Sequence, residues 1–121
     1  MANRITCIVI DAVDVPKLAE FWAAVLGWGV IEADETGVSL GVEGGPFQLD
    51  ILPVPDGPKH VKNRLHLDVN ATDRDQDAEL ERLLALGATK VDIGQGPDVS
   101  WQVLADPEGN EFCLLRGRVE P

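Results

Sequence analysis

Hydrophobic and polar positions alternate in two similar runs along the 121 residues of the chain. In the first run, apolar residues at spacings of three and four predict a helix over 15–26 that buries one stripe. Asp14 stands at the N-cap position, and Gly27 suits a left-handed C-cap. Segments rich in apolar residues and bounded by turn residues predict strands over 5–10, 28–33, 37–42 and 47–52.

The pattern restarts after residues 54–62, a segment rich in proline that is typical of a linker. The second run predicts a helix that Asp73 caps and Gly87 ends. Strands are predicted over 64–70, 89–93, 101–105 and 111–116. Residues 106–109 have the preferences of a type I turn and should join the last two strands. We therefore expect one domain over 1–121, with modules over 5–53 and 63–117.

Three features recur in the same order in both modules. The helix caps Asp14 and Asp73 lie 59 residues apart, and the Leu-Gly helix ends lie 60 residues apart. The closing strands share a Phe-x-Leu motif, beginning at Phe47 and Phe112, 65 residues apart. Coincidence is the alternative, because such caps are common, but neither half could bury much core alone. The repeat predicts an α+β fold made of two βαβββ modules.

The alternation of side chains along a strand assigns polar positions to the face away from the helices. Ile8 and Ile10 should face the first helix, which leaves Cys7 on the opposite face. The same alternation places His66, Gln48 and Cys113 on that face of their own strands. If the modules are related by pseudo-symmetry, these four side chains converge on one concave surface.

The charge of the chain excludes two classes of partner. The net charge is −11, the isoelectric point is near 4.4, and the sequence holds no cluster of basic residues. Binding to nucleic acid or to an anionic membrane surface is therefore not expected. The longest apolar stretch, 21–31, is too short to span a bilayer, and no signal peptide is visible. Two cysteines do not make a disulfide framework, so we expect a cytoplasmic protein with reduced thiols.

Three segments together resemble the vicinal-oxygen-chelate superfamily, which includes glyoxalase I, extradiol dioxygenases, and fosfomycin- and bleomycin-resistance proteins. They are AVDVPKLAEFWAAVLGW (12–28), KNRLHLDV (62–69) and DPEGNEFCLL (106–115). The chain is most similar to the small bacterial glyoxalase-like domains of this superfamily. The resemblance implies two βαβββ modules that form a cup-shaped mixed sheet, and a homodimer.

In metal-dependent members of the superfamily, the ligands come from the first and last strand of each module. The resemblance carries this role to Cys7, Gln48, His66 and Cys113, of which only His66 is an ordinary ligand of such a site. One imidazole, one amide and two thiols do not suit Mn²⁺ or Mg²⁺, whereas two thiolates and an imidazole suit Zn²⁺. We therefore assign no certain cofactor, with a divalent metal, Zn²⁺ or Ni²⁺, as the alternative.

Other polar and aromatic residues are candidates for the same surface. His66 with Asp68 nearby has the chemistry of a general base, the alternative being a polar lining without chemistry. Trp28 and Trp101 begin strands, where they either stack on a flat ligand or pack in the core. The expected ligand-binding residues are Gln48, Arg64, Trp28, Trp101 and Glu111.

The sequence thus predicts a glyoxalase-like protein that binds a small organic molecule in a concave sheet pocket, with a degenerate metal site. The alternative is a metal-dependent lyase or dioxygenase that uses the Cys7/Gln48/His66/Cys113 set.

Overall fold

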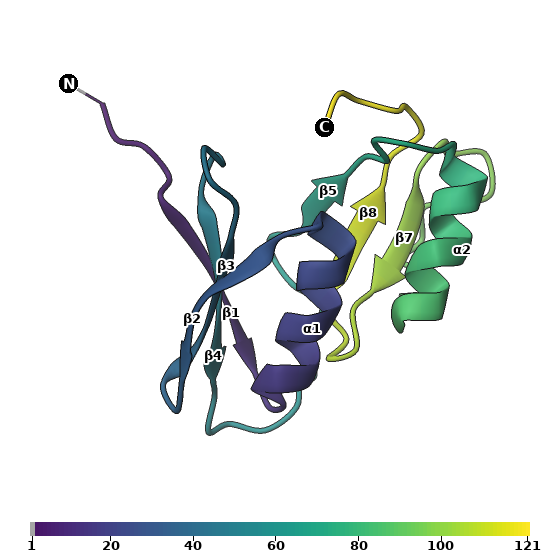
Figure 1. The fold of residues 1–121 in the computed structure, drawn as a ribbon. Helices are drawn as coiled ribbons and strands as arrows, with labels where there is room; N and C mark the ends of the chain where they lie inside the picture. The colour runs from purple at the N-terminus through teal and green to yellow at the C-terminus, as the bar shows by residue number, and fades with distance from the viewer. Residues whose placement is uncertain (1) are drawn as a thin grey trace. The chain divides into compact units, whose positions relative to one another are not determined.

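The computed structural model describes residues 2–121, which divide into two compact units that part between Pro58 and Lys59. This boundary lies inside the predicted linker 54–62. Each unit holds one helix and one four-stranded mixed sheet (Figure 1).

The first unit has the predicted order of strand, helix and three strands. Its elements are β1 (Cys7–Ala12), α1 (Val15–Leu26), β2 (Gly29–Asp34), β3 (Gly37–Gly41) and β4 (Gln48–Pro53). The sheet order is β1-β4-β3-β2, in which β1 runs parallel to β4 and the other neighbours are antiparallel.

The second unit repeats this topology. Its elements are β5 (Leu67–Val69), α2 (Gln76–Leu86), β6 (Thr89–Lys90), β7 (Gln102–Ala105) and β8 (Glu111–Leu114). The sheet order is β5-β8-β7-β6, with β5 parallel to β8. The predicted α+β class with two βαβββ modules is confirmed.

Helix α1 begins and ends at the residues that the sequence indicates. The Asp14 carboxylate accepts a hydrogen bond from the Lys17 amide at 3.2 Å, and Gly27 ends the helix in the left-handed conformation, at φ 68°. The apolar stripe is buried, with Leu18 and Trp22 at most 1% exposed. The stripe therefore anchors α1 in the core of the first unit, as the spacing of its apolar residues predicts.

Helix α2 begins two residues later than predicted, so the assignment of Asp73 as its cap is wrong. Asp75 is the N-cap, with extended backbone and a carboxylate that accepts from the Ala78 amide at 2.8 Å. The Asp73 carboxylate instead pairs with Arg74. Two aspartates with the same capping preference, Asp73 and Asp75, precede this helix, and only the one directly before its first residue can reach the free amides.

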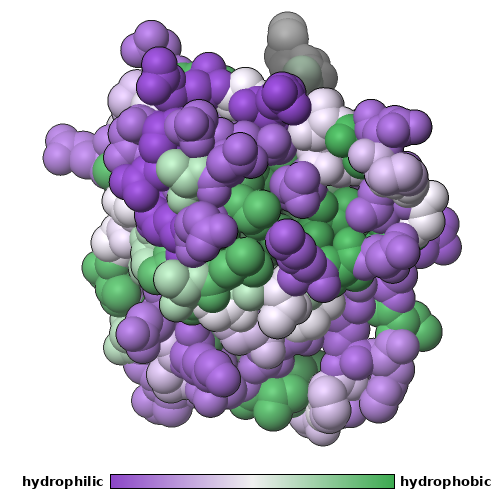
Figure 2. All heavy atoms as spheres, turned by 90° about the vertical axis from the view of Figure 1, so that its right-hand side faces the viewer, coloured by the Kyte–Doolittle hydropathy of each residue, from purple (hydrophilic) through white to green (hydrophobic). Residues whose placement is uncertain are grey.

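The buried stripe of α2 is narrow, because Leu83 is fully buried whereas Leu80 and Leu84 are only half-buried. Glu79 lies beside it, 6% exposed, and its carboxylate accepts two hydrogen bonds from Arg82. Figure 2 faces the right-hand side of Figure 1. Hydrophilic residues cover much of the surface in this view, and hydrophobic residues are grouped near its centre (Figure 2).

Strand β5 is shorter than the predicted 64–70, and the turn between β7 and β8 gives the reason. In that turn the Gly109 amide donates to the Asp106 carbonyl, and the buried Asp106 carboxylate accepts from the Asn110 amide. Leu67 is opposite Phe112, so residues before His66 would lie opposite this turn. They have no strand to pair with, and β5 begins only at Leu67.

The strand register corrects the alignment of the two modules. Ile8 pairs with Leu49, and Leu67 pairs with Phe112 in the same way. The closing strands are therefore offset by 63 residues rather than the predicted 65. Phe47 precedes β4 and is only half-buried, so it is not the counterpart of the fully buried Phe112.

With this register, Gln48 corresponds to Glu111, and Asp50 corresponds to Cys113. The Phe-x-Leu motif would align Gln48 with Cys113, and this alignment is wrong. The motif begins one residue before β4 in the first unit but at the second residue of β8 in the second unit.

The helices of the described residues are short. The longer of them, α1, has 12 residues, and none is both long and apolar enough to cross a lipid bilayer.

Candidate functional site

Three side chains with metal-ligating atoms meet on the sheet of the second unit. Asp68 on β5 is the register partner of Cys113 on β8, and His66 lies two residues before Asp68 on the same side of the chain. The His66 Nε2 and Asp68 Oδ1 atoms are 3.2 Å apart. One ligand atom from each of His66, Asp68 and Cys113 lies within 4.8 Å of the other two. We refer to these three residues as the His-Asp-Cys group.

The members of the His-Asp-Cys group differ in exposure. The side chains of His66 and Asp68 are 43% and 48% exposed, whereas Cys113 is 6% exposed. Burial raises the pKa of the Cys113 thiol, and the Asp68 carboxylate raises it further, while Lys62 opposes them. In the absence of a bound cation, the thiol is therefore held in its protonated form.

The donor set of the His-Asp-Cys group fits a divalent metal. An imidazole nitrogen, a carboxylate oxygen and a thiol sulfur are the three kinds of ligand that Zn²⁺ takes in proteins, and three such ligands leave one position open. Within residues 2–121, this is the one group of three such side chains whose ligand atoms lie so close together. Sequence reasoning placed His66 and Cys113 in a metal site but gave Asp68 only an acid–base role.

The first unit brings together Cys7, Gln48 and Asp50. Cys7 is the register partner of Gln48, and the Gln48 Nε2 atom donates to Asp50 Oδ1 at 3.1 Å. Partial burial raises the pKa of the Cys7 thiol, and its interaction with the Asp50 carboxylate adds to that rise. Asp50 was missed as a site residue, although strand alternation places it on the same face as Gln48.

The predicted four-residue metal set thus falls into two pairs. Cys7 and Gln48 meet in the first unit, and His66 and Cys113 meet in the second. The convergence of the two pairs on one surface stays a prediction.

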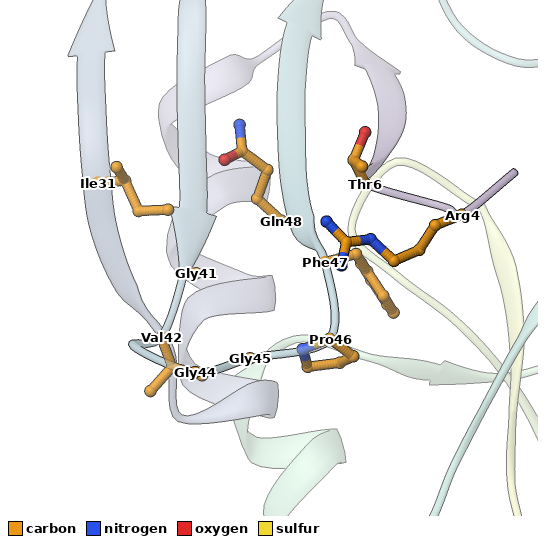
Figure 3. A pocket seen from close by; sticks show the side chains of 10 residues that line it. All are labelled: Arg4, Thr6, Ile31, Gly41, Val42, Gly44, Gly45, Pro46, Phe47 and Gln48. Atoms are coloured by element: carbon orange, nitrogen blue, oxygen red, sulfur yellow. The ribbon is translucent and has the colours of Figure 1, made fainter.

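A hollow of about 290 Å³ opens on the first unit beside Gln48 (Figure 3). Seven of its ten lining residues are apolar residues or glycines and three carry polar side chains, while polar atoms of the backbone and side chains form the larger part of the exposed wall. The lining residues are Arg4, Thr6, Ile31, Gly41, Val42, Gly44, Gly45, Pro46, Phe47 and Gln48.

Gly41 leaves room for the hollow. A Cβ atom at this position would lie 2.5 Å from Ile31 Cδ1 and 3.7 Å from Gln48 Cβ, so any side chain here would push into the space between them.

Glu111, an expected ligand-binding residue, binds Lys59 of the linker and Asn63, which follows the linker. Its carboxylate accepts from the Lys59 ammonium and from the Asn63 backbone amide, each at 2.9 Å. Partial burial alone would raise the pKa of Glu111, but the Asn63 amide and the Lys59 ammonium together outweigh it and lower this pKa. The carboxylate is thus engaged within the second unit.

The remaining candidates lie apart from these groups. Trp28 does not line the hollow but packs edge to face on Phe47, which does, with ring centroids 5.7 Å apart. Trp101 is 38% exposed and comes directly before β7, and Arg64 is exposed before β5.

Comparison with known proteins agrees with this architecture. The glyoxalase-like domain family matches residues 7–115. A search of curated proteins found no significant match. A mutant of the fosfomycin resistance protein FosX from Listeria monocytogenes, complexed with Mn(II) and 1S,2S-dihydroxypropylphosphonic acid, has a similar structure. Its TM-score is 0.74 at 18% identity, over 98% of this chain and 94% of that one.

Two further solved structures share the fold. FosX from Mesorhizobium loti has a TM-score of 0.71 at 17% identity, over 98% of this chain and 95% of its own. The bleomycin-binding protein from Streptomyces verticillus, complexed with copper(II)-bleomycin, has a TM-score of 0.59 at 23% identity, over 98% and 100% of the two chains. Because the family match extends over nearly the whole chain, this protein belongs to the glyoxalase-like domain family of the vicinal-oxygen-chelate superfamily.

Proposed function

We propose that this protein binds a small organic molecule in the hollow on its first unit. The observation that carries the proposal is the hollow itself, which joins apolar walls at Ile31 and Phe47 to polar groups at Arg4 and Gln48. Sites for small molecules likewise bring apolar contacts and placed polar groups together in one concave region. Structural neighbours of the chain hold small molecules, namely copper(II)-bleomycin and a phosphonic acid.

A thermal-shift screen with a broad library of small molecules tests the proposal, because a ligand that binds the folded state raises the melting temperature. Gly41→Ala adds a methyl group between Ile31 and Gln48 at the wall of the hollow, so it should reduce the shift produced by a true ligand. Gly29→Ala is the matched control, since a Cβ atom at Gly29 meets nothing within 4 Å. The proposal is wrong if no compound stabilises the protein, or if the Gly41 variant responds like the control.

The second candidate function is a metal-dependent lyase or dioxygenase, and the His-Asp-Cys group is the observation that favours it. His66, Asp68 and Cys113 would hold the metal, which acts as a Lewis acid toward a bound oxygen when present. The His66 Nε2 and Asp68 Oδ1 atoms lie 3.2 Å apart, so the carboxylate is close enough to orient the imidazole ring for ligation or proton transfer. The deeply buried Cys113 limits the access of water to one side of the group.

Titration with Co²⁺ tests the second candidate independently of activity. A thiolate bound to Co²⁺ gives a charge-transfer band in the near ultraviolet, which reports directly on ligation by sulfur. We expect this band in the native protein and in Cys7→Ser, and its loss in Cys113→Ser. If no band forms, and protein purified without chelators contains no stoichiometric metal, this candidate is excluded.

We also propose a homodimer, because β2 forms one edge of the first sheet and all six of its residues are exposed. An exposed edge strand offers unpaired backbone groups to a second chain. Light scattering that gives the mass of a single chain would contradict this proposal.

A further inference from the structure

The charges around the hollow of the first unit are unlike those of the unit as a whole. Residues 1–58 contain nine acidic side chains but only two basic ones, Arg4 and Lys17. Arg4 lines the hollow, whereas none of the nine carboxylates does. Among the described residues that line the hollow, Arg4 is therefore the one with a charged side chain, although the unit as a whole is strongly acidic.

The Arg4 guanidinium is available to a ligand. Within the described part of the chain it makes no hydrogen bond or ion pair, and its residue is exposed. The side chain extends toward Phe47 and the start of β4 at Gln48 (Figure 3). Because guanidinium presents a planar fork of N–H donors, it matches the paired oxygens of a carboxylate or a phosphonate.

Gln48 offers the hollow a hydrogen-bond acceptor, whereas Arg4 offers donors. Its amide nitrogen donates to Asp50 Oδ1 at 3.1 Å, which leaves the amide oxygen as an acceptor. Asp50 itself does not line the hollow. A ligand can therefore place an anionic group at Arg4 and direct a donor toward Gln48, while Ile31 and Phe47 contact its apolar body.

We infer that the ligand of this hollow is a small organic anion, whose charged group binds Arg4 and whose apolar body packs on Phe47. The inference deepens the proposed function and rests on it. It predicts that the hollow distinguishes a carboxylate from a neutral molecule of the same shape.

Benzoate and benzamide form a suitable probe pair, because they share a ring and differ in charge. Binding of each is followed by two-dimensional NMR of the amide signals of Thr6, Phe47 and Gln48. We expect benzoate to bind at least about five times more tightly than benzamide, in keeping with the modest strength of a partly exposed ion pair.

Variants of the two basic residues separate a local contact from general electrostatics. Arg4→Gln should weaken benzoate binding by at least about fivefold and leave benzamide binding unchanged. Lys17→Gln removes the same charge from the first turn of α1, away from the hollow, and should leave both affinities unchanged.

The outcomes distinguish this inference from the proposed function. Equal affinity for the two probes, or equal losses in the Arg4 and Lys17 variants, would overturn the inference and leave the binding function standing. If neither probe shifts the three signals and the library screen also gives no ligand, both are contradicted.

Discussion

Asp68 and Cys113 are register partners across the parallel strands β5 and β8, so a carboxylate lies beside a buried thiol. The Asp68 charge opposes ionisation of Cys113, and Lys62 favours it. The same carboxylate that would share a metal with the thiol therefore suppresses the thiolate when no metal is bound.

This relationship predicts opposite effects of two neutralising substitutions on the Cys113 thiol in metal-free protein. Asp68→Asn should lower the pKa of Cys113, because it removes a negative neighbour. Lys62→Gln should raise the same pKa, because it removes a positive one. The thiolate absorbance near 240 nm, followed against pH in a Cys7→Ser background, measures both shifts. If neither substitution shifts the pKa of Cys113, burial alone sets it, and the two charges have no influence on the thiol.

The Glu111 contact predicts an acid-dependent loss of stability. The pKa of Glu111 is below its usual value of 4.5, so the folded state favours the ionised form. Its contribution is fully present above the unfolded pKa and is lost as the pH falls through the lower folded pKa. Glu111→Gln should lower the free energy of unfolding by about 1–2 kcal/mol at neutral pH and by less in acid.

Urea unfolding at a series of pH values measures this effect. Glu81→Gln, at an exposed position on α2, is the control and should leave the profile unchanged. The difference in the free energy of unfolding between Glu111→Gln and the native protein should shrink as the pH falls. If it stays constant, the charge of the Glu111 carboxylate does not contribute to its contacts with Lys59 and Asn63.

The N-cap of α2 gives a prediction that separates two neighbouring aspartates. Asp75→Ala removes the acceptor of the Ala78 amide and should cost about 1 kcal/mol of stability. Asp73→Ala removes only an exposed pair with Arg74 and should leave the melting temperature unchanged. Equal effects of the two variants would mean that the helix begins elsewhere.

Gly37, at the start of β3, occupies a position that only glycine fits. Its φ is 145°, and a Cβ atom would lie 2.7 Å from the Ile51 carbonyl oxygen, which belongs to the backbone and cannot move aside. Gly37→Ala should destabilise the protein by about 1–3 kcal/mol. Gly29→Ala, which has open space, should be close to neutral in the same thermal unfolding experiment.

Local sequence patterns predicted the directions of the site's side chains but not the register of the strands that carry them. Strand alternation correctly placed His66, Asp68 and Cys113 on one face, because side-chain direction depends only on position along a strand. It did not give the offset between β4 and β8, because register depends on pairing between strands that are far apart in sequence. Asp50 was therefore overlooked as the counterpart of Cys113.

The sequence by itself determined the order of the elements, the Asp14 and Gly27 caps of α1 and the repeated βαβββ topology. These follow from short-range spacing and from the conformational preferences of single residues. Only the tertiary structure decided that Asp75 caps α2, that Glu111 binds Lys59 and Asn63, and that Arg4 lines a hollow with Phe47 and Gln48. Each of these depends on which groups the folded chain brings within a few ångströms of one another, and local sequence preference does not encode such distances.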